Sequence, residues 1–122
     1  GTWLWLAHLA MVVHGMAVNF NASSTFGSWV FLSFTVTSWN LIILHSALHV
    51  LMAWIPACAD LAALVRFPMV TFNTVTFVIW WLVLFPGGTL LLKGAQRAWF
   101  LRLQVMYSLL NVHVFNFGFA VL

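Results

Sequence analysis

The chain has 122 residues, of which 65% are hydrophobic and 4% are charged. Soluble domains carry about 25% charged residues, so a chain this apolar cannot cover itself with polar surface in water and must have lipid as part of its surroundings. The net charge of +3 comes from four basic residues and one acidic residue, Asp60, and gives no indication of nucleic-acid binding. Cys58 is the only cysteine, which excludes an intrachain disulfide and a metal site built from several thiolates.

The apolar runs predict an all-α, integral membrane helical bundle with about four transmembrane helices. We expect the helices at residues 2–19, 27–54, 67–85 and 103–122, within one transmembrane domain that covers residues 1–122. Residues 19–26 are expected to form a polar turn, and Pro86 is expected to end the third helix. The sequence therefore predicts a multipass protein with little mass outside the bilayer.

Polar residues lie inside these runs, where an unpaired polar group is costly. Ser33, Thr37 and Asn40 share one arc of the second predicted helix, whereas Ser38, His45 and His49 share another. Hydrogen bonding between helices accounts for most such residues. A buried imidazole also needs either a partner or a ligand, so the histidines are candidates for a site.

The missing motifs exclude several kinds of chemistry. There is no second carboxylate, no Gly-rich phosphate loop, and no HExxH or CxxC motif, so we predict no metal site and no two-carboxylate mechanism. A hydroxyl with an imidazole is the minimum for nucleophilic acyl transfer. Imidazole can also be an axial ligand to haem or chlorophyll, for which the candidates are His8, His45 and His49. His8 and His113 are the pair best matched in depth for a haem with two histidine ligands.

Four stretches of the chain together resemble the androgen-induced-gene family of multipass membrane proteins. They are Ser24-Thr25-Phe26-Gly27-Ser28-Trp29-Val30-Phe31-Leu32-Ser33-Phe34, Asp60-Leu61-Ala62-Ala63-Leu64, Phe67-Pro68 followed by Phe77 to Trp81, and Leu110-Asn111-Val112-His113. Their order and rough spacing agree with the family across residues 24 to 116. The first stretch, with its Gly-Ser-Trp block, is the most specific.

The resemblance implies an intramembrane hydrolase of fatty-acid esters of hydroxy fatty acids. Family members use a threonine nucleophile and a histidine, and the resemblance places Ser33 at the threonine and His113 near the histidine. The side chains of Asn40, Thr37, Asn111 and Asn116 are candidates for oxyanion support. The chain departs from the family in reading Asn111-Val112-His113-Val114-Phe115 where the family has Asn-His-Gly-Met-His. The family also has six helices, whereas four are predicted here.

Three functional interpretations remain open. The leading one is a non-catalytic accessory subunit of a respiratory or photosynthetic membrane complex, in an organellar inner membrane (mitochondrial) or a thylakoid, with other membrane subunits and the lipid bilayer as partners. The second is a Ser/His hydrolase of lipid esters, which would fit the endoplasmic reticulum. The third is a haem- or chlorophyll-binding subunit. No cofactor is expected under the first two.

Overall fold

The computed structural model describes residues 1–121, and every regular element in that range is helical. Three helical stretches among these residues are long and apolar enough to cross a membrane: Thr2–Phe26, Phe34–Leu51 and Ala57–Leu91. The all-helical prediction is therefore confirmed, and the apolar helices are compatible with an integral membrane protein. The predicted number of four transmembrane helices is not confirmed.

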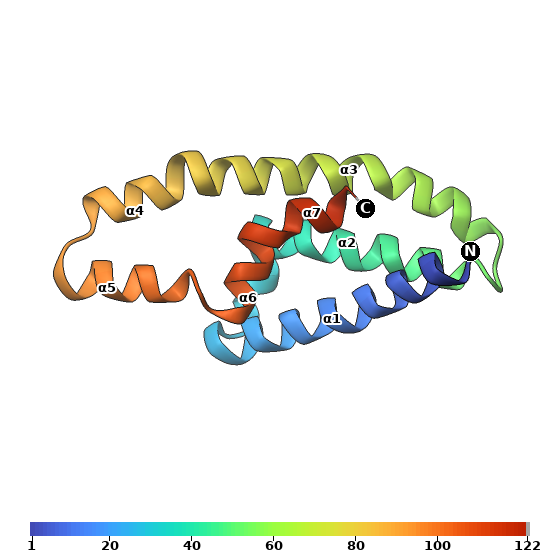
Figure 1. Cartoon of the computed structure of the whole chain (residues 1–122), viewed down its shortest axis with the longest axis horizontal. Helices are drawn as coiled ribbons and strands as arrows, with labels where there is room; N and C mark the ends of the chain where they lie inside the picture. Colours follow the sequence, from blue (N-terminus) through green and yellow to red (C-terminus); the bar gives the residue numbers. More distant parts are fainter. Residues whose placement is uncertain (122) are drawn as a thin grey trace.

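Three long helices run side by side, and the rest of the chain is arranged around them (Figure 1). They are α1 (Thr2–Phe26), α2 (Phe34–Leu51) and α3 (Ala57–Ile79), with α2 in contact with both of the others. A π-helical turn (Trp80–Leu84) joins α3 to α4 (Phe85–Leu91), and α4 forms a hairpin with α5 (Gly94–Leu103) that extends past the ends of α1 and α2. The chain returns through α6 (Tyr107–Leu110), a second π-helical turn (Asn111–Phe115) and α7 (Asn116–Ala120).

α1 continues through residues 19–26, which the sequence predicted to be a turn. The polar side chains there find partners within the helix or on its neighbours: Ser23 Oγ donates to the Phe20 carbonyl (3.2 Å), and Asn19 Nδ2 donates to Asn40 Oδ1 on α2 (2.7 Å). The helix ends at Gly27, whose φ of 89° lies in a region that residues with a side chain rarely adopt.

The predicted helix at residues 27–54 is interrupted near its start. A 3₁₀ turn covers Ser28–Leu32, and Ser33 has an extended backbone (φ −73°, ψ 147°) before α2 begins. Ser33 Oγ accepts a hydrogen bond from the Val36 N–H (3.2 Å), which makes Ser33 the N-cap of α2.

α3 begins at Ala57, earlier than the predicted start at Phe67, and the helical rod continues past Pro86. Asp60 lies in its first turn, where a carboxylate interacts favourably with the helix dipole. The Phe85 N–H donates to the Trp80 carbonyl in the wider π turn, so Pro86 falls in the first turn of α4, where its missing N–H is tolerated. At 1.5 Å per residue the rod from residue 57 to 91 is about 52 Å long.

The fourth predicted span, residues 103–122, is not one helix in the described structure. α5 ends at Leu103, the chain turns, and the stretch from α6 to α7 covers residues 107–120. That stretch is about 21 Å long at 1.5 Å per residue, which is shorter than the hydrocarbon core of about 30 Å. It packs against α1, α2 and α3. Leu122 lies outside the described residues.

The core lies between α1, α2 and α3, and residues 112 and 120 of the C-terminal stretch complete it. Trp39 is fully buried, and its indole Nε1–H donates to the Gly15 carbonyl on α1 (3.3 Å). The Ile43 side chain lies directly against Gly15, so that a Cβ on residue 15 would overlap it. Small residues allow membrane helices to approach closely in this way.

Adding a side chain at Gly15 should therefore push α1 away from α2. We expect Gly15→Val to lower the free energy of unfolding by about 1–3 kcal/mol through overpacking. Gly118→Val is the matched control, because a Cβ there meets no atom within 4 Å, and it should change stability by less than about 0.5 kcal/mol. Denaturant unfolding in mixed micelles, followed by circular dichroism, measures both changes.

Ile43→Ala provides a second check on that contact. The double variant Gly15→Val/Ile43→Ala should be more stable, by at least about 1 kcal/mol, than the sum of the two single effects predicts. Strict additivity would show that the two residues do not limit the helix approach.

Candidate functional site

Ser33 and His113, the pair indicated by the family resemblance, line one cavity of about 280 Å³. The cavity lies between the end of α1, the 3₁₀ turn, the start of α2 and the second π turn. Its lining is mostly apolar and includes Trp29, Trp80 and Leu109. The fold thus brings together a hydroxyl and an imidazole that lie far apart in the sequence.

His113 is buried and held by two adjacent tryptophans. Its ring stacks on Trp80 with centroids 3.7 Å apart and an interplanar angle of 3°. Its backbone carbonyl accepts a hydrogen bond from Trp81 Nε1 (3.0 Å). The Nδ1 atom of His113 is buried and has no hydrogen-bond partner among the described residues. His113 therefore offers this cavity one unused polar atom.

The Ser33 hydroxyl, in contrast, is occupied by the backbone around it. Its Oγ donates to the Val30 carbonyl (2.7 Å) and accepts from the Val36 N–H (3.2 Å). No hydrogen bond joins it to His113 in the described structure. Sharing a cavity therefore does not amount to an activated pair, because a nucleophilic hydroxyl needs its base within about 2.6–3.2 Å.

The residues predicted to support an oxyanion form links within and between helices, and none of them lines this cavity. Thr37 Oγ1 donates to the Ser33 carbonyl (2.8 Å), and Asn116 Nδ2 donates to the Asn73 carbonyl (3.1 Å). Asn40 Oδ1 accepts from Asn19 (2.7 Å), and Asn111 Oδ1 accepts from His14 (2.7 Å). The hydrogen bonds of Asn40, Asn111 and Asn116 reach other helices, which is the structural role that the sequence also allowed.

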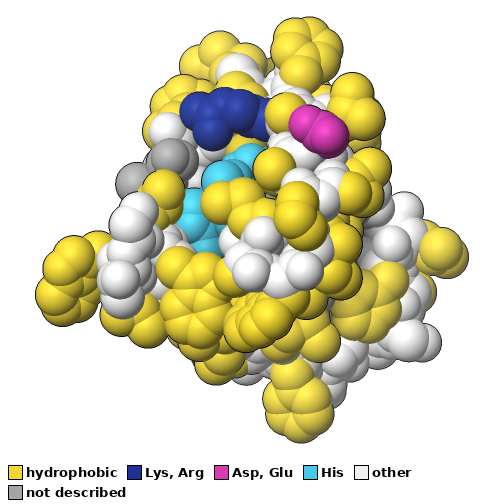
Figure 2. Space-filling model, turned by 90° about the vertical axis from the view of Figure 1, so that its right-hand side faces the viewer, with side chains coloured by type: hydrophobic (Ala, Val, Ile, Leu, Met, Phe, Trp, Pro, Cys, Tyr) yellow, Lys and Arg dark blue, Asp and Glu magenta, His cyan; other side chains and the backbone are white. Residues whose placement is uncertain are grey.

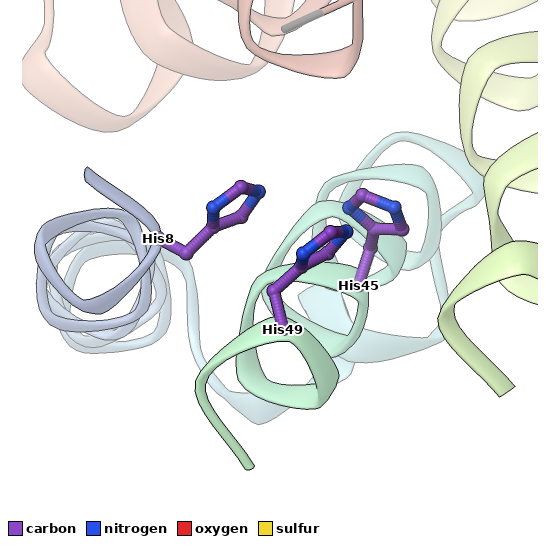
Figure 3. A group of neighbouring side chains, drawn as sticks. All are labelled: His8, His45 and His49. Atoms are coloured by element: carbon purple, nitrogen blue, oxygen red, sulfur yellow. The ribbon is translucent and has the colours of Figure 1, made fainter. Parts of the chain in front are cut away.

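A second cavity, of about 470 Å³, opens near the other end of α2, where α1 begins. Its lining includes His8, His14 and His45 together with apolar side chains such as Met69. Figure 3 shows His8 on α1 facing His45 and His49, which lie one turn apart on α2. The ligand atoms of these three histidines all lie within 4.8 Å of one another.

The sequence singled out His8, His45 and His49 as separate candidates for a haem or pigment ligand, and did not predict that they would meet. The spacing of His45 and His49 places them on one helix face, but only the packing of α1 against α2 adds His8. The predicted His8–His113 haem pair is divided between the two cavities.

His14, which the sequence analysis did not select, lines the larger cavity but has partners for both ring nitrogens. Nε2–H donates to Asn111 Oδ1 (2.7 Å), and Nδ1 accepts from the Tyr107 hydroxyl (2.9 Å). His14 therefore joins α1 to the start of the C-terminal stretch, and its role is structural.

No family model, curated protein or solved structure matches this chain. The class that the fold supports is an all-helical protein with three helices suited to crossing a membrane.

The assignment of Asn116 as a structural residue can be tested against Thr37, another predicted oxyanion residue. Asn116 is fully buried and donates to Asn73 on α3, so Asn116→Ala should lower the free energy of unfolding by about 1–3 kcal/mol. Thr37 is exposed and bonds within its own helix end, so Thr37→Ala should cost no more than about 0.5 kcal/mol. Unfolding titrations in micelles give both values, and equal effects would contradict the assignment.

Proposed function

We propose that this chain is a non-catalytic accessory subunit of a multisubunit membrane complex, and that the cavity lined by Ser33 and His113 holds the acyl end of a lipid. The lipid-binding part rests on the lining of the cavity: it is mostly apolar, the Ser33 hydroxyl is already used by the α2 cap, and His113 Nδ1 and Ser108 Oγ are buried without a hydrogen-bond partner in the described structure. That combination suits binding better than covalent chemistry.

The walls of the cavity suit a hydrocarbon chain. Phe26, Trp29 and Trp80 supply aromatic surface, and Leu109 and Val112 supply aliphatic surface. Ligand pockets usually combine such walls with a few polar groups that fix orientation. The Nδ1 atom of His113 is the group that can meet the carboxyl or ester end of a lipid.

Catalysis by Ser33 would require the start of α2 to rearrange. The Oγ proton would have to turn from the Val30 carbonyl toward His113, and the capping hydrogen bond from the Val36 N–H to Oγ would become weaker. Losing an N-cap costs about 1 kcal/mol. The sequence departure around His113 also agrees with a loss of catalysis.

The α4–α5 hairpin supports membership of an assembly. The rod that begins at residue 57 is about 52 Å long at 1.5 Å per residue, so it exceeds a bilayer of about 40–45 Å including its headgroups. The hairpin carries Lys93, Arg97 and Arg102, yet Leu91 and Trp99 on it are exposed. Charged and large apolar side chains on one projecting element suit a protein partner. An organellar inner membrane or a thylakoid is the setting we propose for such a complex.

A lipid ester hydrolase is the second candidate, and one observation favours it: Ser33 and His113 line the same cavity. In this reading Ser33 Oγ attacks the ester carbonyl while His113 accepts its proton and returns it to the departing alcohol as the ester C–O bond breaks. Water then hydrolyses the acyl-serine to release the fatty acid. The resemblance to the androgen-induced-gene family supports the same pair, and this reading fits the endoplasmic reticulum.

Filling the cavity should prevent lipid binding. Val36 is buried and lines the cavity, whereas Val78 on α3 is exposed. We expect Val36→Phe to reduce crosslinking of a photoreactive fatty acid to Trp29 and Trp80 by at least about tenfold, which corresponds to about 1.4 kcal/mol, and Val78→Phe to leave it unchanged. Mass spectrometry of the labelled peptides locates the crosslinks.

Two results would contradict the proposal that this cavity binds a lipid but does not hydrolyse it. Equal crosslinking of the two phenylalanine variants would mean that the fatty acid binds elsewhere. Covalent labelling by a fluorophosphonate that disappears in Ser33→Ala would show an activated serine, and the hydrolase reading would replace the non-catalytic one.

Membership of a complex predicts how the chain migrates from its native membrane. In blue-native electrophoresis after mild detergent extraction, we expect the chain in a band of several subunits, identified by mass spectrometry. Changing the exposed pair on the hairpin, Leu91→Ser/Trp99→Ser, should release it from that band, because apolar anchors contribute most of the energy of an interface. Leu4→Ser/Val13→Ser on α1 is the control, since those side chains are also exposed. Migration of the wild-type chain alone would contradict the assembly.

A further inference from the structure

We propose that His8, His45 and His49 bind one divalent transition-metal ion, with Zn²⁺ as the ion of reference. This inference is independent of the proposed function, because His8 and His45 line the other cavity and His49 lies beside them. It begins from their donor atoms, all within 4.8 Å of one another and contributed by two helices. Imidazole is a ligand that suits zinc, copper, iron and nickel.

Each of the three side chains has a ring nitrogen that no hydrogen bond occupies in the described structure. His8 Nδ1–H donates to the Leu4 carbonyl (2.8 Å), which places the lone pair of the ring on Nε2. A bond of this kind to a backbone carbonyl is the usual outer contact of a metal-binding histidine. His49 Nδ1 is buried without a partner, and no hydrogen bond joins any two of the three rings in the part of the chain that is described.

Packing alone explains this arrangement less well than a ligand does. His8 and His49 are stacked, with centroids 4.1 Å apart and an interplanar angle of 11°, and His45 is tilted against both. Polar side chains that only join helices would hydrogen-bond to one another, as His14 does with Asn111 and Tyr107. These three imidazoles meet without hydrogen bonds to one another, so a bound ion would supply the interaction that holds them together.

To bind one ion, the stacked rings of His8 and His49 must turn so that their lone pairs converge. Zn–N bonds of about 2.0–2.1 Å put the donor atoms of a tetrahedral site about 3.3 Å apart. Rotation of the His8 and His49 side chains out of their parallel stack is the movement that the proposal requires. Three protein ligands leave a fourth position open, and the 470 Å³ cavity lined by His8 and His45 has room for a water or a small ligand there.

The surroundings of the three histidines provide access for an ion and place a positive charge nearby. Figure 2 shows histidine side chains in a recess at the end of the molecule where α1 begins, beside a basic side chain. Arg66, the basic residue of α3, is close enough to His45 and His49 to act on them electrostatically. A positive charge there opposes the binding of a dication, and an anionic fourth ligand such as hydroxide would reduce that opposition.

The same geometry argues against haem. Two axial histidines of a haem lie on opposite sides of the porphyrin plane, whereas the rings of His8 and His49 stack face to face. A single ion at the edge of the stack needs no space between the two rings, and His45 lies within reach of the same point.

Metal titration of the purified full chain in mild detergent, after treatment with a chelator, tests the site. We expect one Zn²⁺ per chain, measured by competition with a chromophoric chelator, and visible absorption of bound Co²⁺ as evidence of nitrogen ligation. His8→Ala, His45→Ala and His49→Ala should each weaken binding by at least about tenfold. His14→Gln is the matched control, because His14 lines the same cavity and glutamine can keep its hydrogen bonds, and it should bind as tightly as the wild type.

A measurement on the wild type alone keeps the test sharp if an alanine variant does not fold. Zn²⁺ bound to the native state should raise the Tm, and Mg²⁺ at the same concentration should not. The proposal is overturned if Zn²⁺ leaves the Tm unchanged, or if the three alanine variants bind it as well as the wild type does. It is also overturned if added haem, and not Zn²⁺, binds in a way that His8→Ala abolishes.

Discussion

The antiparallel register of α1 on α2 is the constraint on which both cavities depend. Three contacts spread along α1 fix it: Trp5 Nε1 donates to the Val50 carbonyl (3.1 Å), Gly15 lies against Ile43, and Asn19 pairs with Asn40. Apolar surface provides little driving force between helices in lipid, so close packing and hydrogen bonds must specify such a register. A shift of one turn would move His8 away from His49 and would also displace the end of α1 that closes the smaller cavity.

Composition and the apolar runs were sufficient to predict an all-helical chain with helices suited to a membrane, but not where those helices end. The sequence placed Pro68 at the start of the third helix, since proline suits a first turn, and Pro86 at its end, since proline interrupts most helices. In the structure Pro68 lies inside α3, and a π turn carries the rod across Pro86. Asn19 was read as part of a turn, although its partner on α2 allows it to remain helical. Boundaries of this kind depend on tertiary hydrogen bonds that a single sequence does not contain.

The sequence also predicted some features of the candidate sites and not others. The family resemblance named Ser33 and His113, and the fold does bring them to one cavity, but it also gives Ser33 a capping bond that no spacing could have indicated. The i, i+4 spacing of His45 and His49 was visible in the sequence. Adding His8 required the register of α1, which is determined by contacts many residues away. Local patterns therefore predicted which side chains share a helix face, and packing decided which of them meet.

Hydrogen bonds between helices identify several polar residues that join the bundle together. Asn73 donates to the Ser38 and Met69 carbonyls (2.8 Å each) and accepts from Asn116, so these amides join α2, α3 and α7 in the middle of the bundle. The side chains of His49 and His113 make no hydrogen bond in the described structure, and each has a buried Nδ1. An unpaired buried nitrogen is costly in a low-dielectric interior. These two imidazoles lie near opposite ends of the central helix, with the amide network between them, so the two proposed ligand sites would be separate from one another.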